Sequence, residues 1–131
     1  MLPYLSDEWL AAADAAVRED DALAGTTADV VLVIEQTVRG GPRGDRTYHV
    51  ALDRGTVSIA PGPASGADIT FATDWATAVA IAQGAESAQV AFMAGRLRLG
   101  GDARALLERS ATLAELTDAL GPLRADTDFD G

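Results

Sequence analysis

The spacing of apolar residues predicts an amphipathic helix near the beginning of the chain. Ser6 is a favourable N-cap, and the acidic residues after it suit the positive end of the helix dipole. Leu5 and Leu10 have the spacing of a hydrophobic staple. We therefore expect a helix to about Asp21, with the chain released near Gly25, and one buried stripe formed by Trp9, Ala13, Ala16 and Val17.

The middle of the chain alternates in the manner of β-strands. Residues 29–38 are apolar on both faces, which is typical of a central strand or of one that lines an apolar space. Residues 46–53 alternate, and a tight turn leads from them into residues 56–60. We expect these three strands to form an antiparallel meander. Residues 68–71 form a fourth strand after a loop rich in glycine and proline.

Two helices and another strand are predicted next. Thr73 is the expected cap of a helix over residues 74–83. Ser87 is the expected cap of a second, shorter helix, which stops at Gly95. Arginine and leucine alternate over residues 96–99, which predicts a fifth strand.

The last part of the chain is predicted to be helical. Asp102 is the expected cap of one helix, and Thr112 and Glu115 have the spacing of a capping box that begins another. A Gly-Pro pair at 121–122 is expected to stop that helix. The remaining residues are acidic, and we expect them to be loose.

The order of these elements defines the fold class. The strands are too clustered for a regular alternation of strand and helix, so we expect an α+β fold with one sheet and helices on it. The 131 residues fit a single domain. Its parts are an N-terminal helix over 1–27, a core over 28–120 and an acidic tail over 121–131.

The charge balance bears on the choice of partners. The chain has 20 acidic and 10 basic residues, a net charge of −10. Such a surface repels nucleic acid and anionic headgroups, so nucleic acid is not an expected partner. The N-terminus has no pattern of a signal peptide, and no apolar stretch approaches the roughly 20 residues that span a bilayer. We expect a cytoplasmic protein without stable membrane insertion.

The sequence offers little for catalysis or metal binding. It has no cysteine, and its single histidine, His49, supports neither a usual zinc site nor a Ser-His-Asp arrangement. Asp68, Thr70 and Asp74 cluster without a positioned nucleophile. Residues 126–131 match the opening of a calcium loop but end before its bidentate ligand. We expect a protein that is not an enzyme and uses no metal and no cofactor.

Two segments resemble the sterol carrier protein type 2 family. The first is Ala-Asp-Ile-Thr-Phe at 67–71, and the second is Phe-Met-Ala-Gly-Arg-Leu-Arg-Leu-Gly-Gly-Asp at 92–102. The likeness extends over about residues 28–120, with arginine at position 96 where lysine is frequent in the family. The resemblance implies a five-stranded, mainly antiparallel sheet covered on one face by helices, with an apolar cavity between them.

The same resemblance implies a non-enzymatic lipid-binding or lipid-transfer protein. The expected ligand is a fatty acid, an acyl-coenzyme A, a phospholipid, a sterol or another apolar small molecule. We predict that its tunnel is lined by Trp75, Val79, Phe92, Met93, Leu97, Leu99 and Leu106. Arg96 and Arg98 are the candidate contacts for an anionic headgroup.

Other interpretations fit the same residues. The apolar positions match an ordinary filled core, and the two arginines match the charged face of an edge strand. In that case the chain is a ligand-free module of the same fold, which forms a homodimer or assists an enzyme encoded elsewhere.

Overall fold

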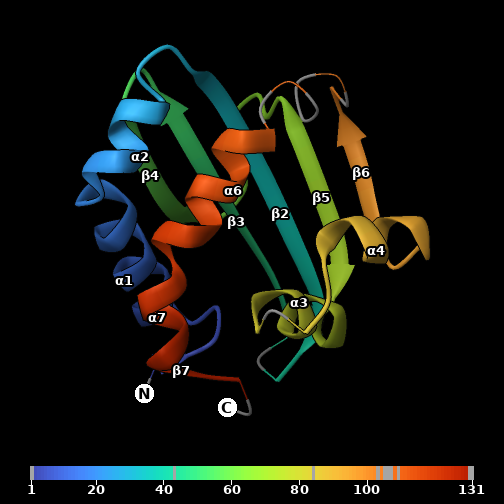
Figure 1. Cartoon of the computed structure of the whole chain (residues 1–131). Helices are drawn as coiled ribbons and strands as arrows, with labels where there is room; N and C mark the ends of the chain where they lie inside the picture. The colour runs from blue at the N-terminus through green and yellow to red at the C-terminus, as the bar shows by residue number, and fades with distance from the viewer. Residues whose placement is uncertain are drawn as a thin grey trace.

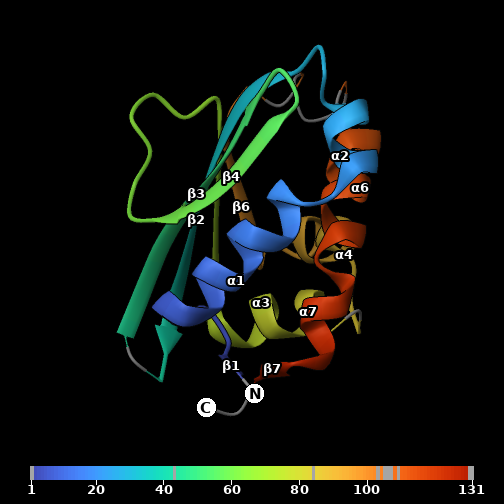
Figure 2. The ribbon, with the colours of Figure 1, turned by 90° about the vertical axis from the view of Figure 1, so that its left-hand side faces the viewer.

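The molecule consists of a five-stranded sheet with helices on one face (Figures 1 and 2). The computed structural model describes residues 2–42, 44–83, 85–102, 104, 108 and 110–129. The strands are β2 (Val31–Gly41), β3 (Gly44–Asp53), β4 (Thr56–Pro61), β5 (Ile69–Asp74) and β6 (Leu97–Gly101). Their order is β4-β3-β2-β5-β6, and every neighbouring pair is antiparallel except β2 with β5. This confirms the α+β class and the mainly antiparallel sheet.

The face of the sheet toward the helices, here called the inner face, carries the core. Leu32 pairs with Leu52, and Ile34 lies between Val50 on one side and Ile69 on the other. All five are buried. Because side chains alternate along a strand, the residues between them point to the opposite, outer face. The alternation in the sequence therefore identifies the inner face correctly.

His49 lies on the outer face, in register with Glu35 on β2. Its Nδ1 is 2.9 Å from the carbonyl oxygen of Gly62. The residue is partly exposed. His49 is thus a partly exposed residue of strand β3.

The N-terminal helix is divided in two. Helix α1 (Asp7–Arg18) begins at Ser6, whose hydroxyl accepts a hydrogen bond from the backbone N–H of Trp9. Helix α2 (Asp21–Thr26) follows, and the carboxylate of Asp20 accepts from the backbone N–H of Leu23 at 2.9 Å. The predicted single helix to about Asp21 is wrong at its end, because Asp20 caps a new helix.

Helices α3 (Trp75–Ala82) and α4 (Ala88–Met93) follow strand β5. Ser87 caps α4, as predicted. The predicted cap of α3 is wrong, since Asp74 and not Thr73 accepts the hydrogen bond from the backbone N–H of Thr77. Thr73 is buried, and its hydroxyl donates to the carbonyl oxygen of Arg96 at 2.8 Å.

The C-terminal helices begin at other places than the pattern predicts. Helix α6 (Ser110–Ala119) already includes Thr112, so the predicted capping box does not begin it. Helix α7 (Gly121–Ala125) starts at the Gly-Pro pair that we expected to be a stop, because proline is favourable in a first helical turn. Most of the helix predicted after Asp102 lies outside the described residues.

The two ends of the chain are joined by a second, two-stranded sheet. Strand β1 (Leu2–Pro3) pairs in parallel with β7 (Thr127–Asp128) at the base of the molecule (Figure 1). The ring of Phe129 lies 5.1 Å from that of Tyr4. The predicted loose tail is wrong for residues 127–129, since these contacts, distant in sequence, hold it in place.

Candidate functional site

A pocket lies between the inner face of the sheet and the helices, with a volume of about 180 Å³. Strands β2 and β3 supply one wall, and α1, α3, α7 and both ends of the chain supply the others. We call it the inner pocket. It is lined by Tyr4, Trp9, Gln36, Tyr48, Ala78, Ile81, Ala82, Leu120, Arg124, Thr127 and Phe129.

The polar groups of the inner pocket are mostly paired with one another. The hydroxyl of Tyr48 donates to Oε1 of Gln36 at 2.8 Å, and Nε1 of Trp9 donates to the hydroxyl of Thr127 at 2.8 Å. Burial raises the pKa of Tyr48 well above its ordinary value, so its phenol stays neutral. Arg124 is the one charged side chain among the described residues of this pocket.

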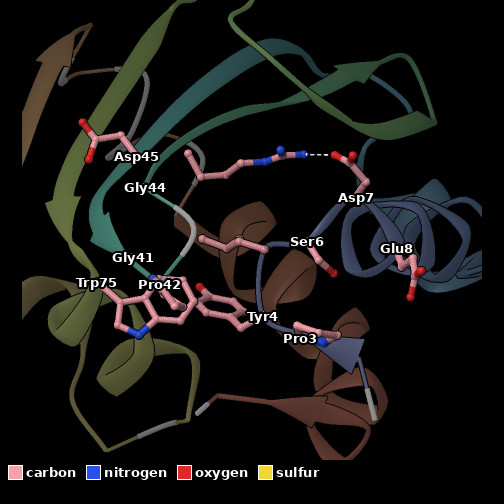
Figure 3. Close-up of a pocket in the computed structure, with 12 residues that line it drawn as sticks. Pro3, Tyr4, Ser6, Asp7, Glu8, Gly41, Pro42, Gly44, Asp45 and Trp75 are labelled. Carbon is pink, nitrogen blue, oxygen red and sulfur yellow. Dashed lines mark hydrogen bonds and ion pairs between the residues drawn. The ribbon is translucent and has the colours of Figure 1, made fainter. Parts of the chain in front are cut away.

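A larger pocket of about 440 Å³ lies beside the N-terminal segment, here called the outer pocket (Figure 3). The segment before α1, the first turn of α1, the connection from β2 to β3 and the start of α3 surround it. It is lined by Pro3, Tyr4, Leu5, Ser6, Asp7, Glu8, Gly41, Pro42, Gly44, Asp45, Arg46 and Trp75. This lining is aromatic on one side and charged on the other.

Arg46 is the basic residue of the outer pocket within the described part of the chain. Its guanidinium forms an ion pair with the carboxylate of Asp7. The Nε–H of the same guanidinium is buried and has no hydrogen-bond partner among the described residues. A buried donor of this kind is costly to leave unpaired.

Four of the predicted lining residues face the interior. Trp75 is partly buried and lines the outer pocket, where its ring lies against Gly41. Val79 is partly buried against the core. Leu97 is buried and Leu99 partly buried, in register with Thr73 and Phe71 of β5. Val79, Leu97 and Leu99 line neither of the two pockets.

The remaining three predicted lining residues are not among those that face the interior. Phe92 and Met93, near the end of α4, are 50% and 77% exposed. Leu106 lies outside the described residues. The predicted set thus divides into an interior group and an exposed group.

The two arginines predicted to meet a headgroup are exposed and line neither pocket. The Nη1 of Arg96 donates to Glu86 at 2.6 Å, and this hydrogen bond lowers the pKa of the Glu86 carboxyl. Arg98 lies in register with Ala72, on the outer face of the sheet. Both belong to the edge of the sheet rather than to the space under the helices.

The carboxylates at the two ends of β5 have structural roles. Asp68 accepts a hydrogen bond from the backbone N–H of Val33 at 2.9 Å. Asp74 caps α3, and the hydrogen bond from Thr77 lowers the pKa of its carboxyl. Among the residues that the structure describes, no three histidine or acidic side chains are grouped to hold a metal ion.

None of the residues that line the inner pocket belongs to the predicted lining set. Gln36 carries a signal that could have been used, because it is a polar residue at an inward position between Ile34 and Val38. Arg124 and Phe129 carry no such signal. Phe129 follows the paired strand β7, and Arg124 lies on helix α7, so both are placed at the pocket by the tertiary structure.

Comparisons with known proteins agree with this arrangement. Residues 10–114 match the model of the SCP-2 sterol transfer family. A conserved hypothetical protein from Thermus thermophilus is similar in structure, with 21% identity, a TM-score of 0.72, and 91% of this chain and 88% of that chain covered. A crystal structure of sterol carrier protein 2 has the same identity of 21% and TM-score of 0.72, covering 88% of this chain and 95% of that one.

A third similar structure is the ubiquinone synthesis protein UbiJ-SCP2, with 15% identity and a TM-score of 0.60 over 90% of this chain and 94% of that one. At such identities the solved structures show a shared fold. A search of curated protein sequences found no significant match.

The fold and the family model therefore point to one assignment. The model covers the sheet and most of the helices on it. It also includes the two segments, 67–71 and 92–102, on which the resemblance was based. The resemblance is confirmed, and the chain belongs to the SCP-2 sterol transfer family.

Proposed function

We propose that the protein binds a lipid by its apolar chain in the inner pocket and carries it without chemical change. The observation that supports this most directly is the lining of that pocket. Aromatic and aliphatic side chains surround it, its two buried tyrosines, Tyr4 and Tyr48, are neutral, and Arg124 is the one charged side chain among its described residues. A space between sheet and helices with few polar groups is the usual form of a site for an apolar ligand.

Burial of the chain supplies the affinity. Each methylene removed from water contributes about 0.8 kcal/mol. A chain with about ten buried methylenes gives micromolar binding once the costs of association are subtracted. We propose that Val79, Leu97 and Leu99 extend the apolar surface along the inner face, and that Phe92 and Met93 meet the ligand from α4.

The polar end of the ligand is assigned to Arg124. This side chain is exposed, so a carboxylate beside it stays in contact with water. A guanidinium favours an anionic acceptor through charge-assisted hydrogen bonds. Fatty acids, which have one chain and one carboxylate, are therefore the first ligands to test.

The experiment combines mass spectrometry with a binding assay. We expect native mass spectrometry of freshly purified protein to show one lipid per chain, and a fluorescent fatty acid to bind with micromolar affinity. Arg124→Gln should weaken that binding about three- to tenfold, since the lost pair is solvent-exposed. The matched control is Arg39→Gln, an exposed arginine at the end of β2 that lines neither pocket.

A second function is supported by the similarity to the ubiquinone synthesis protein. In this alternative, the domain assists an enzyme or forms a homodimer and holds no lipid. A ligand-free dimer in the mass spectrum, together with no uptake of the fluorescent fatty acid, would favour the alternative over the carrier.

A further inference from the structure

The aromatic ring of Tyr4 lies between the inner and the outer pocket. Tyr4 is the one residue, among those the structure describes, that lines both. Its ring centroid is 5.0 Å from that of Trp9, in the inner pocket, and 5.4 Å from that of Trp75, in the outer pocket. Figure 3 shows Tyr4 beside Trp75 and Pro42. The phenol therefore forms the wall between two spaces that are otherwise neighbours.

The two pockets differ in volume, and Tyr4 separates the smaller from the larger one. Sites for small ligands usually measure about 300–1,000 Å³. The inner pocket, at about 180 Å³, falls below that range, and the outer pocket, at about 440 Å³, falls within it. An alkyl chain that enters the inner pocket soon meets the ring of Tyr4. Removal of that ring would open the way from one pocket into the other.

The ring is held by packing and not by its hydroxyl group. Tyr4 is 7% exposed, and its ring meets the rings of Trp9, Trp75 and Phe129. Its hydroxyl donates no hydrogen bond to any described residue. Phenylalanine at this position would therefore keep the wall, whereas alanine would remove it.

We propose that Tyr4 determines the length of the lipid chain that the protein accepts. The end of the chain stops against the Tyr4 ring, and the outer pocket is the blocked continuation of the same path. This inference rests on the proposed lipid binding. It assigns to Tyr4 a role in specificity that is separate from the affinity for lipids in general.

The first test uses saturated fatty acids of about eight to sixteen carbons, with displacement of a fluorescent fatty acid as the readout. In the wild-type protein and in Tyr4→Phe, affinity should rise about fourfold per methylene and then stop rising when the inner pocket is full. In Tyr4→Ala the rise should continue. The longest acid should then bind Tyr4→Ala about tenfold or more tightly than wild type, while the shortest acid binds both alike.

The second test uses the two tryptophans of the chain as reporters, because Trp9 lines the inner pocket and Trp75 the outer one. Single-tryptophan proteins are made with Trp9→Phe or Trp75→Phe. A long fatty acid that carries bromine at its chain end should quench the fluorescence of Trp9 more strongly than that of Trp75, because the Tyr4 ring lies between the bromine and Trp75. After Tyr4→Ala, the same acid should quench Trp75 as well.

The outcomes separate this inference from the proposed function. Equal dependence on chain length in wild type, Tyr4→Phe and Tyr4→Ala, with tight binding throughout, would overturn the role of Tyr4 and leave lipid binding intact. Quenching of Trp75 as strong as that of Trp9 while Tyr4 is in place would do the same. No binding of any fatty acid to wild type would overturn both. If circular dichroism shows that Tyr4→Ala is unfolded, the quenching test in the Tyr4 protein still decides the matter.

Discussion

Gln36 and Tyr48 are polar side chains on a sheet face that is mainly apolar. They are in register on neighbouring strands, and a 2.8 Å hydrogen bond joins the Tyr48 hydroxyl to Oε1 of Gln36. An unpaired polar group in this place would be costly, whereas a mutually bonded pair is tolerated. Because the pKa of Tyr48 is raised by burial, the pair remains uncharged at neutral pH. The inner pocket thus contains a polar patch that repels no lipid by charge.

The residues predicted to line the tunnel can be tested one at a time. Val79→Trp adds bulk beside the core, and we expect it to reduce uptake of a fluorescent fatty acid several-fold while circular dichroism is unchanged. Phe92→Ala should also reduce uptake, because it removes an exposed ring from α4. Val31→Trp, at a 61% exposed position on β2, is the control for added bulk. If both variants take up the probe as wild type does, neither side chain contacts the lipid.

At the scale of helices and strands, local signals were sufficient for the sheet and insufficient for the ends of helices. Strict alternation over residues 46–53 and 56–60 identified two strands and their inner face. The position of a helix end depends on which of two adjacent polar residues caps the helix. Asp74 caps α3 because Thr73 is bonded to the carbonyl oxygen of Arg96, and that bond is not visible in a sequence.

The candidate site could be predicted from the sequence less completely than the sheet. Trp75 was predicted because it lies on the apolar face of a helix, and that periodicity is local. Tyr4 and Phe129 stand at opposite ends of the chain, yet their rings are 5.1 Å apart. No pattern within a short window links such residues. Contacts of this kind form the walls of both pockets, so pocket geometry required the structure.

The cap of α3 gives a prediction that depends on pH. Asp74→Ala removes a carboxylate that accepts a hydrogen bond from the backbone N–H of Thr77 at 2.7 Å. We expect the free energy of unfolding to fall by about 0.5–1.5 kcal/mol at neutral pH. The folded pKa of Asp74 is lowered, so the contribution is present above the ordinary pKa of an aspartate, 3.8, and is lost as the pH falls through the folded value.

Urea unfolding at about pH 7 and about pH 2.5 measures this difference. The difference in the free energy of unfolding between wild type and Asp74→Ala should be larger at about pH 7 than at about pH 2.5. The matched control is Ser6→Ala, which removes a cap that does not titrate. Its effect on the free energy of unfolding should be the same at both pH values. A gap for Asp74→Ala that is independent of pH would mean that the carboxylate is not the stabilising group.

The whole molecule is acidic, with a net charge of −10. No helix among the described residues is long and apolar enough to cross a membrane. Any exchange of lipid with a bilayer therefore involves the approach of a negatively charged surface. Such an approach is opposed by anionic headgroups and depends on the salt concentration.

Transfer of a fluorescent fatty acid to vesicles tests this effect of charge. At low salt we expect slower transfer to vesicles that contain anionic phospholipid than to vesicles of zwitterionic phospholipid alone. The difference should shrink as salt is raised, because the Debye length falls to about 10 Å at 0.1 M. Equal rates at low salt would show that the protein surface does not meet the membrane during transfer.

The pairing of Leu2–Pro3 with Thr127–Asp128 has a practical consequence. Both termini emerge from one small ribbon, and residues of that ribbon border both pockets. An affinity tag fused to either end would begin next to these two pockets, and choosing the other end would not avoid them. Ligand measurements on this protein therefore call for a cleavable tag and for comparison of the material before and after its removal.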